Sequence, residues 1–329
     1  RANASDIFSQ IAKNRAVYTA KAANTSMIAE PYIIRDYNLY FSFSIDDSLG
    51  YSVHEVLDLK QKLTASLTTL QIKPQVVSAT DFLNLSAQLL RPSESAFGEN
   101  IIWDASMSLN QQLTDPAYLR KITSLRVANP HNDIEIYTFR VKDYPLAAPR
   151  LWDMAQAIGE VFGQARFACP FSLSLIYKVM DAKDVIKGGE AQAFNAEVRA
   201  RERQGKSRSA ELDSQMWRDI LSNKESGERI LVTNFQVQIC CRRDEASQHI
   251  SMLTNIFTSK MRWQIERNDL MHMATLLAHI PMSQTSPLFD DLEGLNLTHK
   301  MWATNAANIA PIIAEMKGGS SYKLMLAGR

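Results

Sequence analysis

Three stretches of the chain alternate apolar and polar residues with a period of two, and this pattern constrains the fold most. They cover residues 37–45, 171–179 and 233–241. Successive side chains of a strand point to opposite faces of a sheet, so this period predicts strands with one buried face and one polar face. On residues 171–179 the predicted inner face carries the odd-numbered positions, from Phe171 to Val179.

Helical patterns lie between these strands without the strict alternation of a doubly wound fold. Ser52 and Glu55 form a capping box ahead of an apolar stripe that ends at Leu70. Beyond the third strand, residues 244–261 and 270–279 are typical of helices, with a strand between them. The predicted class is α+β, with mixed sheets and packed helices.

Two further regions contain residues that are typical of turns and loops. Residues 122–127 and 134–141 read as strands on either side of an Asn-Pro-His-Asn turn, which predicts a β-hairpin. The region after the last predicted helix contains Pro281, Pro287 and Gly294, which interrupt regular secondary structure. We therefore expect this region to be rich in loops.

Two prolines, Pro145 and Pro149, bracket an uncharged connector and predict a domain boundary. We expect an N-terminal α/β subdomain over residues 1–148 and a second α+β subdomain over 149–329. The second subdomain contains a long charged segment, about residues 182–228, which we expect to be a helical insertion that projects from the body.

Composition excludes several classes of function. The net charge is only +1 and 22% of residues are charged, which argues against a chain that binds nucleic acid or membrane through overall charge. No run reaches the roughly 18 apolar residues that cross a bilayer, so no transmembrane segment is predicted. Three cysteines cannot all pair, and this favours reduced thiols and the cytosol. Cys240 and Cys241 are neighbours on a strand, so we expect one in the core and one at the surface.

No catalytic, cofactor-binding or metal-binding motif stands out in the sequence. Gly205-Lys206-Ser207 lacks the earlier glycine of a phosphate-binding loop, because Ala200 occupies that position. His272 and His279 are seven residues apart, whereas zinc-binding helices space their ligands by three or four. We therefore assign no catalytic, cofactor or metal residue.

The charged segment supplies the only candidate interface. Its basic residues alternate with acidic ones, and no aromatic residue lies between Phe194 and Trp217 to stack on bases, so no direct nucleic-acid site is predicted. An aromatic anchor with a charged rim is common in protein interfaces. Arg201, Arg203 and Trp217 are accordingly the predicted residues of a partner or subunit contact.

Order and spacing of several short segments resemble a known family. The main segment runs through residues 75–77, 81–92, 103–104 and 109–113, and three further anchors are Arg35-Asp36-Tyr37, Ala168-Cys169-Pro170-Phe171 and residues 324–329. Together they resemble the N-terminal region of the TraC-type conjugation ATPases, the F-plasmid branch of the type IV secretion ATPases.

This resemblance implies a non-catalytic assembly module, with the nucleotide-binding domain, ATP and Mg²⁺ located beyond Arg329. It also implies contacts with other subunits of a homo-oligomer and with inner-membrane secretion-channel proteins, a cytoplasmic location peripheral to the inner membrane, and a role in pilus assembly and DNA transfer. The alternative is a stand-alone cytosolic enzyme whose active site is composed from separate loops. Perturbed carboxylates clustered in a deep pocket would favour that enzyme.

Overall fold

The computed structural model describes chiefly residues 39–43, 50–69, 74–90, 101–113, 118–121, 123–127, 134–145, 169–180 and 228–310. The chain divides into two compact units, residues 1–40 with 312–329 and residues 41–311. Nearly every described residue belongs to the second unit.

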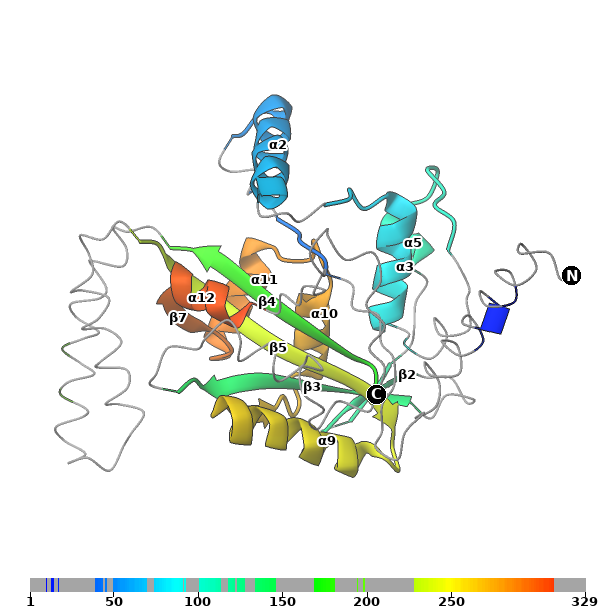
Figure 1. Ribbon diagram of the computed structural model, residues 1–329, viewed down its shortest axis with the longest axis vertical. Helices are drawn as coiled ribbons and strands as arrows, with labels where there is room; N and C mark the ends of the chain where they lie inside the picture. Colours follow the sequence, from blue (N-terminus) through cyan, green and yellow to red (C-terminus); the bar gives the residue numbers. More distant parts are fainter. Residues whose placement is uncertain are drawn as a thin grey trace, which may run out of the picture. The chain divides into compact units, whose positions relative to one another are not determined.

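A seven-stranded antiparallel sheet organises that unit. Its strands are β1 (Tyr118–Arg120), β2 (Leu125–Val127), β3 (Ile134–Asp143), β4 (Phe171–Val179), β5 (Ile230–Arg242), β6 (Gln264–Arg267) and β7 (His299–Trp302). The order is β1-β2-β3-β5-β4, with β6 beside β3 and β7 beside β5. Figure 1 shows β3, β5 and β4 running side by side.

β5 is the central strand, and it is buried on both faces. Twelve of its thirteen residues are buried, and only Arg242 is exposed. It pairs with β4 along one edge, and with β7 and then β3 along the other. The alternation seen in the sequence describes only one face of β5, because the polar residues between the apolar ones are buried as well.

One face of β5 packs on α9 (Ala246–Asn255) and the π-helix η3 (Ile256–Met261), which continues it. Phe235 makes edge-to-face contacts with Phe257 at 6.4 Å and Trp263 at 5.3 Å between ring centroids. Arg262, in the left-handed region at φ 59°, ends η3 and turns the chain into β6. This face is the apolar half of the core.

The opposite face is covered by α10 (His272–His279) and α11 (Ser286–Gly294). One apolar cluster here joins β4, β5, α10 and α11 through Ile176, Val232, Ala278, Phe289, Leu292 and Leu297. A second joins Leu125, Ile136, Cys240 and Leu276, with Leu90 of α3 (Ala79–Leu90) packed against it. Between the two clusters the interface is polar.

Several sequence predictions are confirmed. The α+β class holds, and β4 has the predicted bounds. β2 and β3 pair antiparallel as the predicted hairpin requires, and α9 with η3, β6 and α10 follow in the predicted order. The capping box at Ser52 also forms, ahead of α2 (Val53–Thr69).

Two predictions about strand 37–45 and strand β4 are wrong. The described residues 39–43 are not in a strand, and Leu39, Phe41 and Phe43 are exposed, because alternation alone does not provide a partner strand. On β4 the odd-numbered face is not the buried one as predicted, because residues 171–175 are half-buried on both faces and the one buried residue is Ile176. Ile176 is 7% exposed against α10 and α11, whereas Tyr177, on the predicted inner face, is 59% exposed.

Two other sequence predictions, one on the cysteines and one on the C-terminal region, are also wrong. Cys240 and Cys241 are both buried, since helices cover both faces of β5, so neither is a surface residue. The region predicted to be loop-rich contains α11, β7 and α12 (Ala303–Ile309). Pro287 is compatible with α11 because it lies in the first turn, where a backbone N–H needs no helical acceptor, and Thr285 caps the helix.

The predicted boundary at 148/149 lies outside the described residues, as does almost all of the segment 182–228. The sheet takes β1, β2 and β3 from the first predicted subdomain and β4 to β7 from the second. The division into 1–148 and 149–329 stays a prediction.

The burial of Ile176 beside the exposed Tyr177 can be tested by two adjacent substitutions. Ile176→Asp places an unpaired carboxylate among Val232, Phe289 and Leu292, which costs several kcal/mol. Tyr177→Asp places the same group on an exposed position, and we expect less than about 1 kcal/mol. Urea denaturation of both variants measures the difference. Equal losses would contradict this assignment of the faces.

Candidate interaction surface

The residues predicted for a partner contact, Arg201, Arg203 and Trp217, lie outside the described residues. Of that segment, Phe194 is described, and its side chain is 67% exposed. The prediction of a contact there stays a prediction, and the candidate surface below comes from other residues.

Helix α2 is well formed at its start. The Ser52 amide and hydroxyl both donate to the Glu55 carboxylate, each at 2.8 Å, and the Glu55 amide donates back to the Ser52 hydroxyl. These hydrogen bonds hold the pKa of Glu55 below its usual range. His54 lies 3.5 Å from Asp58 on the next turn. The helix therefore has local reasons to form that do not depend on packing.

No residue of α2 is buried. The apolar stripe predicted from the sequence is present, yet Leu59 and Leu63 on it are 37% and 39% exposed. Leu57 beside the stripe is 51% exposed. A surface helix of a globular protein usually buries such a stripe against its own core, so α2 has an apolar face that the described part of the chain does not cover.

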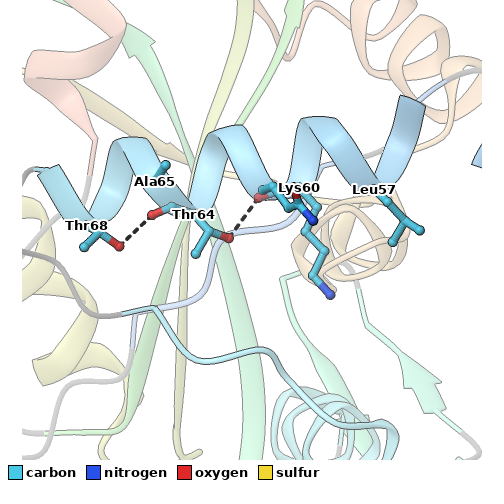
Figure 2. A pocket seen from close by; sticks show the side chains of 6 residues that line it. Leu57, Lys60, Thr64, Ala65 and Thr68 are labelled. Atoms are coloured by element: carbon cyan, nitrogen blue, oxygen red, sulfur yellow. Dashed lines mark hydrogen bonds between the residues drawn. The ribbon is translucent and has the colours of Figure 1, made fainter. Parts of the chain in front are cut away.

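An open groove lies along another side of α2 (Figure 2). Its described lining residues are Leu57, Lys60, Gln61, Thr64, Ala65 and Thr68. Thr64 and Thr68 each donate their hydroxyl to the carbonyl four residues earlier, at 2.8 Å. With the hydroxyls bonded to the helix itself, the groove offers apolar groups, the Lys60 amine and the Gln61 carboxamide. These groups suit contact with another protein.

Exposed apolar residues extend on both sides of α2. Those of the described residues between positions 41 and 77 are Phe41, Phe43, Tyr51, Val53, Leu57, Leu59, Leu63, Val76 and Val77. Single exposed apolar side chains are ordinary, but many of them along one stretch of chain mark an interaction surface. We call residues 50–69, which include α2, the α2 segment.

A second group of functional residue types is buried between α10 and the sheet. The Thr138 hydroxyl lies 2.9 Å from His272 Nδ1 and 2.8 Å from the Thr275 hydroxyl, and the Ser174 hydroxyl lies 3.0 Å from His279 Nδ1. Gln238 donates to the Leu89 carbonyl of α3 at 3.2 Å. The histidines that sequence spacing excluded as zinc ligands therefore attach α10 to the sheet. We call this group the polar layer.

Burial lowers the pKa of His279 to about 4, so the ring is neutral at physiological pH. Its side chain is 5% exposed, and Nε2 has no hydrogen-bond partner. This neutral, buried imidazole attaches α10 to β4 through its hydrogen bond with Ser174.

Glu135 forms the other buried polar cluster. It is 3% exposed and accepts hydrogen bonds from Lys121 Nζ, from the Ser124 hydroxyl at 2.7 Å and from the Tyr137 hydroxyl at 2.9 Å. Burial raises the pKa of this carboxyl, but the three hydrogen bonds outweigh it and keep the pKa below its usual range. Glu135 is thus an ionised group that fixes the turn between β1 and β2 on β3.

Other carboxylates with lowered pKa values are scattered. Asp81 and Asp104 each bond to a nearby serine, Ser78 and Ser106, and Asp269 bonds to Arg267. Within the described ranges no three His, Cys, Asp or Glu residues are placed to hold a metal ion. Nor does any helix there have the length and apolar character needed to cross a bilayer.

Comparison with known proteins gives the family. The model of the TraC protein family matches residues 1–284 of the chain. The chain belongs to the TraC family. It is 22% identical over 319 residues to the protein TraC of Escherichia coli strain K12, a match that covers 92% of this chain and 36% of that protein. The chain thus spans little more than a third of the length of this TraC relative, and membership associates it with type IV secretion and conjugation.

The segment that carried the resemblance to TraC is held together by amide side chains. In α3, Asn84 accepts a hydrogen bond from the Ile101 amide at 2.8 Å. Gln112, 8% exposed, accepts from the Asp104 amide and donates to the Asp104 and Met107 carbonyls, all at 2.8 Å. These residues of the TraC segment have structural roles, since their polar groups are used within the segment.

Titration of His279 predicts how stability depends on pH. The folded protein binds this proton only near pH 4, but the unfolded chain binds it near pH 6.5, so the free energy of unfolding falls as pH falls between these values. The loss is about 2 kcal/mol at pH 5 relative to pH 7.5. Urea denaturation at both pH values measures it. His279→Gln is the matched control, and an equal loss in that variant would contradict the assignment.

Proposed function

We propose that this chain is the non-catalytic assembly module of a TraC-type ATPase in a type IV secretion system. It works in pilus assembly and DNA transfer, on the cytoplasmic side and peripheral to the inner membrane. Its partners are other subunits of the same ATPase and inner-membrane proteins of the secretion channel. The supporting facts are membership of the TraC family and a seventeen-residue amphipathic helix that buries none of its residues.

The exposure of α2 carries this proposal. Full burial of a leucine stabilises a protein or a complex by roughly 1.5 to 3 kcal/mol, and Leu59 and Leu63 do not obtain this contribution in full within the chain. A helix that is capped but only partly packed is ready to dock on another protein. The net charge of the α2 segment is zero at neutral histidine, with Glu55 and Asp58 against Lys60 and Lys62. Contact through its apolar stripe is therefore not opposed by overall repulsion.

The enzyme alternative has no specific support among the described residues. The carboxylates with shifted pKa values lie on separate elements, and each is bonded to its own serine, lysine or arginine partner. The groove on α2 contains no carboxylate. We therefore propose one function only.

ATP binding tests the non-catalytic part of the proposal. The ATPase machinery is proposed to lie in the part of the parent protein that this chain does not span. Isothermal titration of the purified chain with Mg-ATP is expected to give no saturable heat. Binding at micromolar concentration would contradict a module without a nucleotide site.

The α2 segment tests the assembly part of the proposal. In the parent protein, Leu59→Glu with Leu63→Glu is expected to lower conjugation frequency at least tenfold, because loss of about 1.4 kcal/mol of contact energy reduces affinity tenfold. His54→Glu with Thr69→Glu, outside the apolar stripe and the groove of the same helix, is the matched control and should leave transfer unchanged. Circular dichroism checks that both pairs fold. A folded stripe variant that transfers DNA like the parent would show that α2 is ordinary surface.

A further inference from the structure

Two cysteines lie opposite each other where β4 begins and β5 ends. Phe171 pairs with Ile239 in the antiparallel register of these strands. The same register continues one step further, because the Cys240 amide donates to the Pro170 carbonyl at 3.0 Å. One more step places Cys169 opposite Cys241. Both side chains are 5% exposed, and both are thiols in the structure.

The position of the two cysteines in the pairing of β4 and β5 favours a disulfide between them. Hydrogen-bonded and non-hydrogen-bonded pairs alternate along antiparallel strands. Since Pro170 and Cys240 are joined by a hydrogen bond, continuation of this register into the bend at Cys169 assigns Cys169 and Cys241 to a non-hydrogen-bonded position, for which Cα atoms in a regular sheet are about 4.5 Å apart. Disulfides span Cα separations of about 4.4 to 6.8 Å. The strands therefore hold the two thiols at a distance a disulfide can bridge without backbone movement.

Cys240 provides an internal comparison. It is adjacent to Cys241 in the chain, but its side chain points to the other face of β5, where it packs with Leu125, Ile136 and Leu276. Cys169 is an electrostatic neighbour of both Cys240 and Cys241, so the side-chain face, and not proximity alone, distinguishes the two; the pKa of Cys241 is raised to about 12 chiefly by burial and then by Cys169. The Cys241 thiol is protonated at neutral pH, so its oxidation is slow and requires an oxidant that can enter the fold.

We propose that Cys169 and Cys241 are a cross-strand thiol pair that a hydroperoxide oxidises to a disulfide. One sulfur attacks the peroxide, which breaks the O–O bond, forms a sulfenic acid and releases water from hydrogen peroxide. The second sulfur then attacks the sulfenic sulfur, forms the S–S bond and releases a second water. The two sulfurs lose two electrons, the peroxide oxygens gain them, and both thiol protons leave in water.

The disulfide fixes the start of edge strand β4 on the central strand β5. It also closes a long loop in the unfolded chain, which stabilises the folded state by restricting the unfolded one. The modification does not depend on the function proposed above, because it rests on the register of two strands.

Peptide mapping of the oxidised protein tests the pairing. The purified chain is treated with excess hydrogen peroxide at pH 8.5, alkylated without reduction and digested with trypsin. Cys169 lies on the tryptic peptide 167–178, and Cys240 and Cys241 share the peptide 230–242. The variants Cys240→Ala and Cys241→Ala therefore identify which of the two forms the cross-link, and circular dichroism confirms that each variant folds.

We expect peptides 167–178 and 230–242 to be cross-linked in the unmutated chain (the parent of these variants) and in Cys240→Ala, and not in Cys241→Ala. The oxidised parent should unfold at a temperature several degrees higher, and dithiothreitol should reverse this shift. A cross-link in Cys241→Ala, a bond only between Cys240 and Cys241, or no cross-link in the folded parent under conditions that link it in urea would each overturn the proposal. Should Cys240→Ala not fold, the parent and Cys241→Ala alone still decide between these outcomes.

Discussion

Burial of β5 on both faces is the constraint on which the rest of this fold depends. A strand of thirteen residues with twelve buried needs a cover on each side and a neighbour along each edge. The α9–η3 helix meets the apolar face through Phe257, and α10 and α11 meet the other. The seven-stranded sheet follows from the same requirement, since β4 pairs with residues 231–239 of β5 along one edge, and β7 and β3 pair with residues 230–233 and 236–242 along the other.

The two faces of β5 are buried by different interactions: one face is apolar, and the other carries amide side chains that form hydrogen bonds. Phe235, Val237 and Ile239 are between 0% and 1% exposed and lose contact with water at no polar cost. Asn234, Gln236 and Gln238 are equally buried on the opposite side, where each amide needs partners. Asn234 donates to the Leu297 carbonyl and Gln236 donates to Asn234, so the amides bond to one another and to the loop after α11.

Local patterns could be predicted from the sequence, and long-range ones could not. The bounds of β4 and the capping box of α2 follow from residues close together in the chain. The buried position of β4 does not, because it depends on α10 and α11, which the alternation from Phe171 to Val179 cannot locate. Ile176 lies between Ser174 and Lys178 on its face of the strand, yet it is the position that meets Phe289 and Leu292.

For the candidate interaction surface too, the sequence predicted the local pattern but not the contacts that the pattern makes. The stripe on α2 was visible in the sequence, and a stripe ordinarily predicts burial in the core. That the stripe stays exposed could be learned only from the structure, since the pattern is identical for a core helix and for one that docks on a partner. The predicted contact residues Arg201, Arg203 and Trp217 lie outside the described residues, so that contact stays a prediction.

The polar layer specifies how α10 lies on the sheet, which apolar packing alone would do less strictly. His272 and Thr275 bond to Thr138 of β3, while His279, two turns after His272, bonds to Ser174 of β4. A shift of α10 by one residue would separate these partners and leave several buried polar groups without hydrogen bonds, each at a cost of about 1 to 3 kcal/mol. An apolar interface would lose much less from the same shift. The polar residues thus select one position of α10 across two strands that are joined only through β5, and they couple the helix to the central strand that organises the sheet.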